Sequence, residues 1–450
     1  MAGLKYNQIT RYKVTAICEG PLHIGSAIGG KEEVLIDPLN NRPFVQASSI
    51  AGVFRGYCKE VLKDERYKIL FGTNNVENMS RLSFEDGCFK DNCKMEYRPH
   101  VSINKATGSV SSKTIKGTTS SSGQKFNMEY VGAGSEIIFN MYLYEDTTTS
   151  DNLYDLTNSL LSSMKEGMLQ FGGKKSNGAG ILRLIDLRKR TYKLDTPSDR
   201  QAWIMLNDND LESGFEILTT VKNDKLSYEV VITGRTENYI QVKGLDISGN
   251  GKDAPDSQNI KNAKMEYIIP GSSFKGAIKA QMEKISEYLG CKDLIVSSFG
   301  KAAEHNNSGK IGNMIFADTI IGDSEANDRM PLEHRIHIDK FTGSVFDKGL
   351  FHEKNAAGDV ELKINILDKN EPQKTLGLLL FALRDLAIGA MNLGSGYNVG
   401  KGIINVSKIS IYDIKNEMEA SINYLDGNGT VVDKTGIVNE AINSLKGGRV

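Results

Sequence analysis

Apolar and polar positions alternate along the chain with two periods, and each period occurs in both halves. Alternation with period two predicts β-strands at residues 12–17 and 228–232, each followed by a loop that contains glycine. Apolar residues spaced three and four apart then predict an amphipathic helix in each half. These apolar positions are Ile50, Val53, Phe54, Tyr57 and Val61 in the first half and Phe274, Ile278, Met282, Ile285 and Leu289 in the second.

A second amphipathic helix follows a β-rich middle segment in each half, and it leads into a glycine-rich loop and a last strand. The order β-α-β-β-α-β is that of a ferredoxin-like α+β fold. We interpret both helical stripes as faces that pack against a core. The apolar positions of the second helices are Leu153, Leu156, Leu160, Met164 and Met168, and Leu376, Leu379, Leu380, Leu383 and Ala387.

The recurrence of elements reflects an internal repeat. Five short blocks of the first half match five blocks of the second half in the same order, and we interpret the chain as a tandem duplication. Its predicted repeats are residues 1–213 and 214–450. The matched blocks are 46–52 with 270–276, 70–72 with 298–300, 82–86 with 314–318, 101–110 with 336–345, and 171–180 with 393–402.

Charge and composition limit the possible functions. The 450 residues include 55 Lys and Arg against 56 Asp and Glu, so net charge offers no general attraction for phosphates and any nucleic-acid site must be built locally. No apolar stretch approaches the ~20 residues of a membrane-spanning helix, and no signal-peptide core is visible. Five cysteines are too sparse for a disulfide framework. We expect a cytoplasmic protein without a membrane partner.

Two kinds of loop in each half suit an anionic polymer. The serine loops, residues 46–52 and 270–276, begin a helix, where serine N-caps, free backbone N–H groups and nearby cations suit a phosphate. The glycine-rich loops, residues 171–180 and 393–402, allow close backbone approach, although a tight turn alone also explains them. The predicted contacts are Ser48, Ser49, Arg55, Lys174, Lys175, Ser176, Ser272, Ser273, Lys275, Lys279, Tyr397, Asn398 and Lys401.

As a set, these motifs resemble the RAMP superfamily of CRISPR proteins. More narrowly, the chain resembles the backbone subunits of type III effector complexes, and its two copies resemble the double-repeat subunit of type III-D. The resemblance covers roughly residues 10–190 and 225–412. It is carried by Leu22-His-Ile-Gly25, the run from Ile269 to Gly276, Phe-Gly, the run from Ile338 to Gly343, and the last glycine-rich loop.

The resemblance implies two palms like the RNA-recognition motif, each with a β-hairpin thumb insertion. A guide RNA (crRNA) would lie along the palms, and the thumbs would kink it where it pairs with a target RNA. The implied partners are the guide RNA, the target RNA and other CRISPR effector subunits. The polar segment 109–123 is then either a disordered tip or a hairpin that orders on a partner.

In the family, an aspartate between the first strand and the serine-loop helix cleaves target RNA with a divalent metal. Asp256 matches that position and is the implied catalytic residue and metal ligand, with Mg²⁺ or Mn²⁺ as the cofactor. Asp253 takes its place if the register shifts. The first repeat has Lys31 there, with Glu32 and Glu33 beside it, so we expect cleavage only at the second repeat.

The resemblance thus implies a metal-dependent endoribonuclease. Two alternatives to this function and one alternative to its cofactor stay open at this point. The first is a non-catalytic, structural guide-binding subunit of the same kind of complex. The second is a metal-independent guide-processing ribonuclease, which the shortage of paired histidines in the sequence disfavours. The third concerns zinc, since Cys88, Cys93 and His100 supply three ligands but no convincing fourth. Residues 413–450 have no counterpart in the first repeat.

Overall fold

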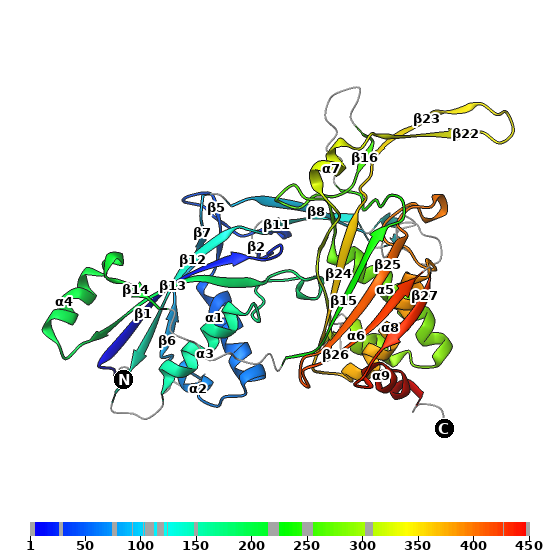
Figure 1. The fold of residues 1–450 in the computed structure, drawn as a ribbon. Helices are drawn as coiled ribbons and strands as arrows, with labels where there is room; N and C mark the ends of the chain where they lie inside the picture. The colour runs from blue at the N-terminus through cyan, green and yellow to red at the C-terminus, as the bar shows by residue number, and fades with distance from the viewer. Residues whose placement is uncertain are drawn as a thin grey trace. The chain divides into compact units, whose positions relative to one another are not determined.

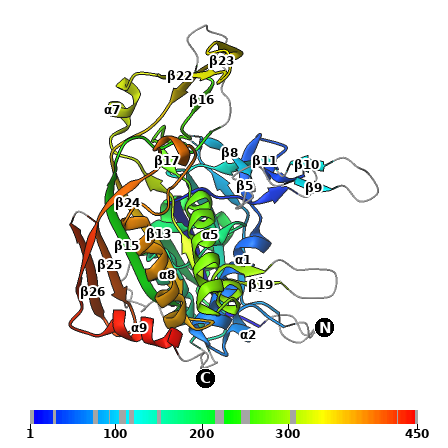
Figure 2. The ribbon, with the colours of Figure 1, turned by 90° about the vertical axis from the view of Figure 1, so that its right-hand side faces the viewer.

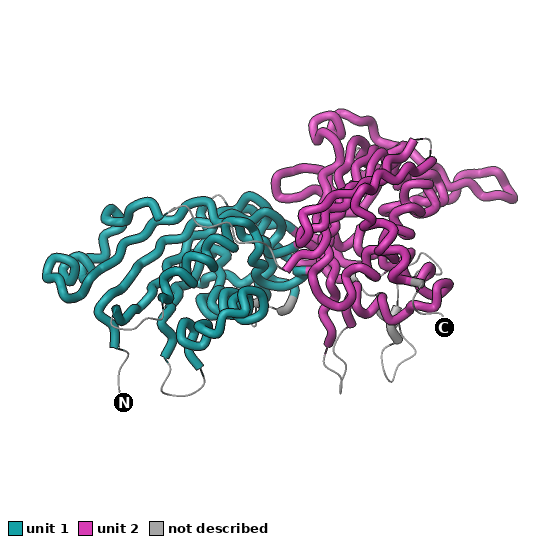
Figure 3. Tube along the Cα trace, turned by 60° about the horizontal axis from the view of Figure 1, so that its bottom comes forward, with its two compact units in different colours: residues 1–96, 129–175, 179–223 teal, residues 97–128, 176–178, 224–450 magenta. Residues whose placement is uncertain are grey.

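A computed structural model of the chain divides into two units (Figure 3). Unit 1 comprises residues 1–96, 129–175 and 179–223, and unit 2 comprises residues 97–128, 176–178 and 224–450. Two segments of the first half therefore lie in unit 2, whereas the repeat boundary at residue 213 stays a prediction. The structure describes residues 5–26, 30–73, 79–91, 93–101, 103, 112–114, 121–123, 125–147, 152–214, 225–244, 255–301, 309–425 and 427–446.

Unit 1 is built on an antiparallel sheet with the strand order β14-β13-β1-β12-β7-β5-β4, and β6 also pairs with β12. β1 is central and pairs antiparallel with β12 on one side and β13 on the other. The strands are β1 (Gln8–Cys18), β4 (Ile36–Asp37), β5 (Arg42–Val45), β6 (Leu82–Phe84), β7 (Gly87–Phe89), β12 (Glu136–Glu145), β13 (Leu182–Lys193) and β14 (Glu212–Ser213), with β2 (Gly25–Ser26) and β3 (Gly30–Val34) as a separate pair.

The two helices that the apolar periodicity predicted in the first half are confirmed in unit 1. α1 buries Ile50 and Phe54, and α3 buries Leu156 and Leu160 in the same core as the sheet. The sequence did not predict α4, whose Trp203 packs edge-on against tyrosines of β12 and β13. The helical segments are α1 (Ala47–Tyr57), η1 (Cys58–Leu62), α2 (Tyr67–Leu70), α3 (Leu153–Lys165), α4 (Pro197–Met205) and η3 (Asp208–Asp210), with η2 (Lys175–Asn177) shared between the units.

Unit 2 has its own antiparallel sheet, with the order β20-β24-β15-β25-β26-β27 (Figure 1). β15 pairs antiparallel with β24 and β25, as β1 does with β12 and β13 in unit 1. The predicted α+β class, with helices and several antiparallel sheets, is confirmed. The strands are β15 (Leu226–Thr236), β20 (Met314–Phe316), β24 (Asp359–Leu367), β25 (Ile404–Asp413), β26 (Met418–Leu425) and β27 (Asn428–Val432).

Helices α5 and α8 lie side by side against one face of this sheet (Figures 1 and 2). Their buried positions include Phe274 and Ile278 of α5 and Leu379 and Leu383 of α8, as the periodicity predicts. None of the helices among the described residues is both long and apolar enough to cross a membrane. The helical segments are α5 (Gly271–Leu289), α6 (Asp293–Phe299), α7 (Ser324–Arg329), α8 (Pro372–Ala387), η4 (Tyr397–Val399) and α9 (Ile437–Lys446).

The C-terminal segment without a counterpart extends unit 2. β26 and β27 lengthen the sheet, and α9 packs on α8. This contact is close, because a Cβ built on Gly377 of α8 would lie 2.2 Å from the carbonyl oxygen of Ala441 in α9. Glycine at this position therefore allows the two helices to approach.

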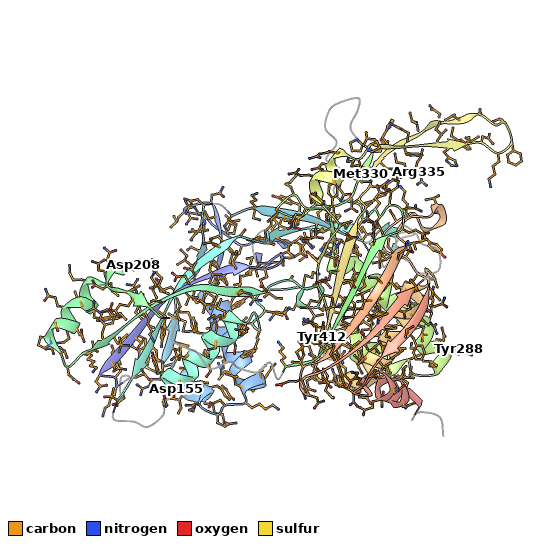
Figure 4. All side chains as sticks on the ribbon, in the orientation of Figure 1. Asp155, Asp208, Tyr288, Met330, Arg335 and Tyr412 are labelled. Atoms are coloured by element: carbon orange, nitrogen blue, oxygen red, sulfur yellow. The ribbon has the colours of Figure 1, made fainter. Side chains whose placement is uncertain are left out.

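A hairpin of β22 (Glu333–Ile338) and β23 (Val345–Lys354) extends from unit 2, and β16 (Ser257–Gln258) pairs parallel with β23. The turn between residues 340 and 345 connects the two strands. Gly343 supplies a φ of 66° there, and the Asp339 carboxylate accepts a bond from the Phe341 backbone N–H. Figure 4 labels Arg335 on this hairpin.

Short strand pairs complete the described structure. β9 and β10 pair within the polar segment 109–123, and the residues between them lie outside the described part of the chain. The remaining strands are β8 (Met95–Val101), β9 (Ser112–Thr114), β10 (Ser121–Gly123), β11 (Lys125–Val131), β17 (Ile268–Ile269), β18 (Gly300–Lys301), β19 (Lys310–Ile311) and β21 (Thr319–Ile320).

Candidate functional site

Asp256 lies at the foot of the β22–β23 hairpin, directly before β16. Its backbone N–H donates to the carbonyl oxygen of His352, and the backbone N–H of His352 donates to Asp256 Oδ2, both at 2.7 Å. The Asp256 carboxylate is exposed, and its hydrogen bond with the backbone of His352 fixes its position. Asp253, the alternative catalytic residue, lies outside the described residues.

A pocket of about 390 Å³ opens beside Asp256. Lys243 brings an ammonium group to it, and Leu350 and Phe351 of β23 bring half-exposed apolar side chains. Such a pocket offers charge to a phosphate and an apolar surface to a base. The lining residues are Lys243, Asp256, Ser257, Leu350, Phe351 and Glu353.

A metal at Asp256 would find no complete set of protein ligands among the described residues. Among the described residues, no group of three His, Cys, Asp or Glu side chains is arranged to hold a metal ion. Mg²⁺ is commonly held by one or two carboxylates, with water and substrate phosphates completing its shell. One exposed carboxylate beside a lysine fits that donor set, provided that the phosphates come from a bound nucleic acid.

Lys401 lies in a buried ion network beneath the hairpin. Its Nζ contacts Glu333 at 2.6 Å and Glu353 at 2.7 Å, and it donates to Asn355 Oδ1 at 3.2 Å. Burial opposes ionisation of Glu353, but the hydrogen bond and charge of Lys401, with Arg335 nearby, hold its pKa below the ordinary value. The sequence had suggested that Lys401 contacts a phosphate. Since the residue is only 3% exposed, its ammonium does not face one.

The predicted serine N-caps are wrong. The N-cap positions are Gln46 and Pro270, and neither makes a side-chain cap bond. Instead, Asp86 Oδ1 accepts from the backbone N–H of Ala47 at 2.7 Å, and Asp318 Oδ1 accepts from that of Gly271 at 2.8 Å. In each helix, an aspartate that is distant in sequence accepts the first helical N–H. The serines lie inside the first turn, because the helices begin at Ala47 and Gly271.

These aspartates change the electrostatics of both serine loops. A carboxylate already stands at the positive end of each helix, which weakens the attraction for a second anion there. The four predicted serines, Ser48, Ser49, Ser272 and Ser273, lie at exposed or half-buried positions of α1 and α5. They remain predicted contacts of an anionic polymer.

Lys275 connects two of the predicted loops. Its Nζ donates to Ser176 Oγ at 2.7 Å, so the end of the first glycine-rich loop lies at the second serine loop within unit 2. Lys279, one turn further along α5, lies 3.9 Å from Glu283 and is partly exposed. Lys275 is thus bound to a serine, whereas Lys279 keeps an accessible ammonium.

The remaining predicted contacts lie at the surface. Arg55 on α1 and Lys175 are exposed, and Lys174 is half-buried with a φ of 56°, in the left-handed region. Tyr397 and Asn398 are exposed in η4 of the second glycine-rich loop. An aromatic ring and an amide at a loop surface can stack on a base or bind a phosphate oxygen.

The cysteines and His100 form no three-ligand group within the described chain. Cys88 is exposed on β7, and Cys93 packs against the core of unit 1. Partial desolvation raises the pKa of both thiols, and nearby carboxylates add to this at Cys88, which disfavours the thiolate that zinc binds. His100 stacks on Phe126, with ring centroids 5.2 Å apart.

In the first repeat, the position equivalent to Asp256 lies in β3, where Glu32 and Glu33 are exposed. A model of the RAMP superfamily matches residues 15–183 and 231–405. The chain belongs to the RAMP superfamily. One matched segment lies in each predicted repeat, so the RAMP unit occurs twice.

No curated protein sequence matches this RAMP protein. Among solved structures, it is similar to a chain of the type III-B Cmr-β complex bound to cognate target RNA, with 17% identity and a TM-score of 0.31. That similarity covers 42% of this chain and 62% of the Cmr-β chain.

Several site residues of this RAMP protein were not predicted from its sequence. They are Lys243 in the pocket, the glutamates that bind Lys401, the two helix-capping aspartates, and a histidine pair across the hairpin. Alternation along β22 and β23 indicates which side chains share a face, but only the register indicates which side chains meet.

Proposed function

We propose that this RAMP protein is a cytoplasmic backbone subunit of a type III CRISPR ribonucleoprotein. In this proposal it binds a guide RNA and cleaves the paired target RNA with a divalent metal at Asp256. The observation that carries the proposal is an exposed carboxylate held at the foot of a hairpin, beside a lysine, in a chain with two RAMP matches.

Each repeat serves as a ferredoxin-like palm in this proposal. Numbered along each repeat, the four central strands lie in the order 4-1-3-2, which is β13-β1-β12-β6 in unit 1 and β25-β15-β24-β20 in unit 2. The helices α1 and α5 follow the first strands, and α3 and α8 follow the third. That order supports the assignment of a ferredoxin-like arrangement.

The β22–β23 hairpin serves as the thumb of the second palm. Its apolar side chains face solvent, which is costly unless a partner covers them. Phe341 at the tip is 98% exposed. We infer that the thumb inserts between bases of the paired RNA, since aromatic rings stack on bases of any sequence. The exposed apolar residues are Ile336, Ile338, Phe341, Val345, Phe346, Leu350 and Phe351.

Guide binding rests on local phosphate contacts, because the formal net charge is −1. The accessible cations Arg55 and Lys279 are the strongest candidates. Lys175 is a weaker one, because desolvation lowers the pKa of its ammonium although the residue as a whole is exposed. Tyr397 and Asn398 add a stacking surface and a hydrogen-bonding amide. Lys401 does not belong to this set, since its charge is balanced within the protein.

For cleavage, the ribose 2′-OH gives its proton to solvent and attacks the adjacent phosphate, the bond from phosphorus to the 5′-oxygen breaks, and the leaving 5′-oxygen takes a proton from water. Asp256 would hold Mg²⁺ or Mn²⁺, which when bound would supply stabilisation of charge on the phosphoryl oxygens. Lys243 orients the phosphate in the pocket, and the thumb bends the strand toward in-line geometry. The backbone bonds with His352 keep the Asp256 carboxylate in place.

One observation favours the alternative of a structural, non-catalytic subunit. Asp256 Oδ2 already accepts a backbone bond, and no second carboxylate joins it in a metal-binding group within the described residues. In that case the subunit binds guide RNA, and a neighbouring subunit cleaves the target.

A cleavage assay with the reconstituted complex and guide-matched RNA separates these functions. Asp256→Ala should lower the rate at one target position by at least about 100-fold, because electrostatic stabilisation of the transition state is lost. Guide binding should change little, since it is spread over many contacts. A chelator should abolish the same cut.

The matched controls are Asp253→Ala and the double variant Glu32→Ala/Glu33→Ala. Both should cut at the wild-type rate. Persistence of the cut in Asp256→Ala with loss in Asp253→Ala would move the catalytic residue by three positions. Unchanged cutting in every variant would support the structural alternative.

A further inference from the structure

Two histidines face each other across the hairpin, one residue in from the end at which it joins the rest of unit 2. His334 of β22 pairs with His352 of β23, and their Nδ1 atoms lie 2.6 Å apart. The ring centroids are 4.7 Å apart, and the ring planes are nearly perpendicular, at 88°. One ring nitrogen therefore donates its proton to the lone pair of the other.

This geometry is close to that of a two-histidine metal chelate. Zinc binds imidazole nitrogen at about 2.0–2.1 Å, so two nitrogens in a tetrahedral shell are roughly 3.3 Å apart. The observed distance of 2.6 Å between the two Nδ1 atoms is roughly 0.7 Å shorter than this separation. Small rotations of the two side chains would replace the shared proton with a metal ion.

The surroundings keep the two faces of this small sheet chemically distinct. Neighbouring residues of a strand point to opposite faces, so Glu333 and Glu353 lie on the face opposite the histidines, where Lys401 and Arg335 bind them. Directly before the neighbouring strand β16, Asp256 Oδ2 accepts from the His352 backbone N–H.

We propose that His334 and His352 bind a divalent transition metal of the zinc class as a two-imidazole chelate. Among the described residues no third protein side chain completes the shell, so water or an anion oxygen fills the other positions. Imidazole nitrogen suits Zn²⁺, Co²⁺ and Ni²⁺, whereas Mg²⁺ and Ca²⁺ prefer oxygen. The site differs in donor type from the Mg²⁺ or Mn²⁺ site at Asp256 and does not depend on it.

A bound ion would join β22 to β23 at the end of the hairpin that attaches to unit 2. The register already pairs Glu333 with Glu353 beside it, and Lys401 bridges those two carboxylates on the other face. Metal on one face and ammonium on the other would hold both strands together and restrict the hairpin. The predicted effect is therefore local rigidity in the hairpin and not a change in the core.

Zinc content after equilibrium dialysis of the full-length protein, followed by elemental analysis, tests the proposal. His334→Gln and His352→Gln should each lower bound Zn²⁺ by about one ion per chain relative to wild type. The matched control is His337→Gln, since His337 lies on the same strand but contacts Phe346 and, among the described residues, no second histidine. It should bind zinc as wild type does.

Hydrogen exchange supplies a second measurement on the same proteins. Zn²⁺ should slow amide exchange at residues 333–336 and 350–353 in the wild type and the control, but not in the two glutamine variants, and Mg²⁺ should have no such effect. Equal zinc content in all four proteins, or equal loss in the His337→Gln control, would overturn the proposal. Neither readout uses RNA or cleavage, so the result is separate from the function proposed for Asp256.

Discussion

At the scale of single residues, three lysines that the sequence placed in one class have different environments. Lys401 is buried between two glutamates, Lys275 donates to Ser176, and Lys279 is partly exposed near Glu283. A buried charge that loses its partner is costly, whereas an exposed pair contributes little. The three positions therefore differ in what substitution should do.

Lys401→Ala should destabilise unit 2 strongly, because Glu333 and Glu353 would lose the cation between them. We expect a loss of about 3–5 kcal/mol in the free energy of unfolding, measured by urea denaturation. Lys279→Ala is the control and should change that free energy by less than about 0.5 kcal/mol. Equal effects of the two substitutions would contradict the role assigned to Lys401.

At the scale of elements, two helical glycines show how close packing decides the effect of one methyl group. A Cβ on Gly377 of α8 would meet backbone atoms of α9, whereas a Cβ on Gly276 of α5 would have no neighbour within 4 Å. Both glycines lie within helices, so their intrinsic preferences are the same. Only the neighbouring element distinguishes them.

Gly377→Ala should therefore destabilise the protein by about 1–3 kcal/mol, since α9 has to move away from α8. Gly276→Ala should stabilise it by about 0.4–1 kcal/mol, because alanine lowers the entropy of the unfolded chain. Urea midpoints of the two variants, without RNA, provide the comparison. A stabilised Gly377→Ala variant would show that α9 does not pack as described.

The hairpin is an element whose exposed surface contributes little to folding. Phe341→Ala should leave the free energy of unfolding within about 0.5 kcal/mol of wild type, since the ring is 98% exposed. In the reconstituted complex it should reduce unstacking of the target base at the thumb, read by fluorescence of a 2-aminopurine placed there. Tyr288→Ala, an exposed aromatic on α5 that Figure 4 labels, is the control and should leave that signal unchanged.

At the scale of the whole molecule, unit 2 depends on segments from the first half of the chain. Arg98 pairs with Asp318 at 2.5 Å, and the two side chains are 7% and 19% exposed. Asp318 in turn caps α5, and Lys275 of α5 binds Ser176. The predicted repeat boundary is therefore not a boundary of the contacts that stabilise unit 2.

A chain divided between residues 213 and 214 tests this dependence. The two co-expressed pieces should co-purify, and the isolated piece 214–450 should unfold at lower urea concentration than unit 2 of the intact chain. The expected loss is about 3 kcal/mol or more, because a buried ion pair loses one partner. An isolated piece as stable as the intact chain would show that residues 97–128 and 176–178 contribute nothing to unit 2.

The sequence by itself determined the elements and their repetition. Apolar periods are local properties, so they located α1, α3, α5 and α8 and the strands β1 and β15 without knowledge of any neighbour. The collinear blocks and their motifs indicated the RAMP family in each half. The predicted serine N-caps were wrong, because in each helix an aspartate far along the chain accepts the first helical N–H in place of a serine.

Only the tertiary structure decided which polar groups meet. The burial of Lys401 between two glutamates, the joining of Lys275 to Ser176, and the contact of His334 with His352 all depend on strand register and loop placement. Register is a relation between segments that are far apart in sequence, and many registers satisfy the same hydrophobic pattern on an exposed hairpin. The candidate position of Asp256 came from the sequence, whereas its backbone bonds and its pocket came from that register.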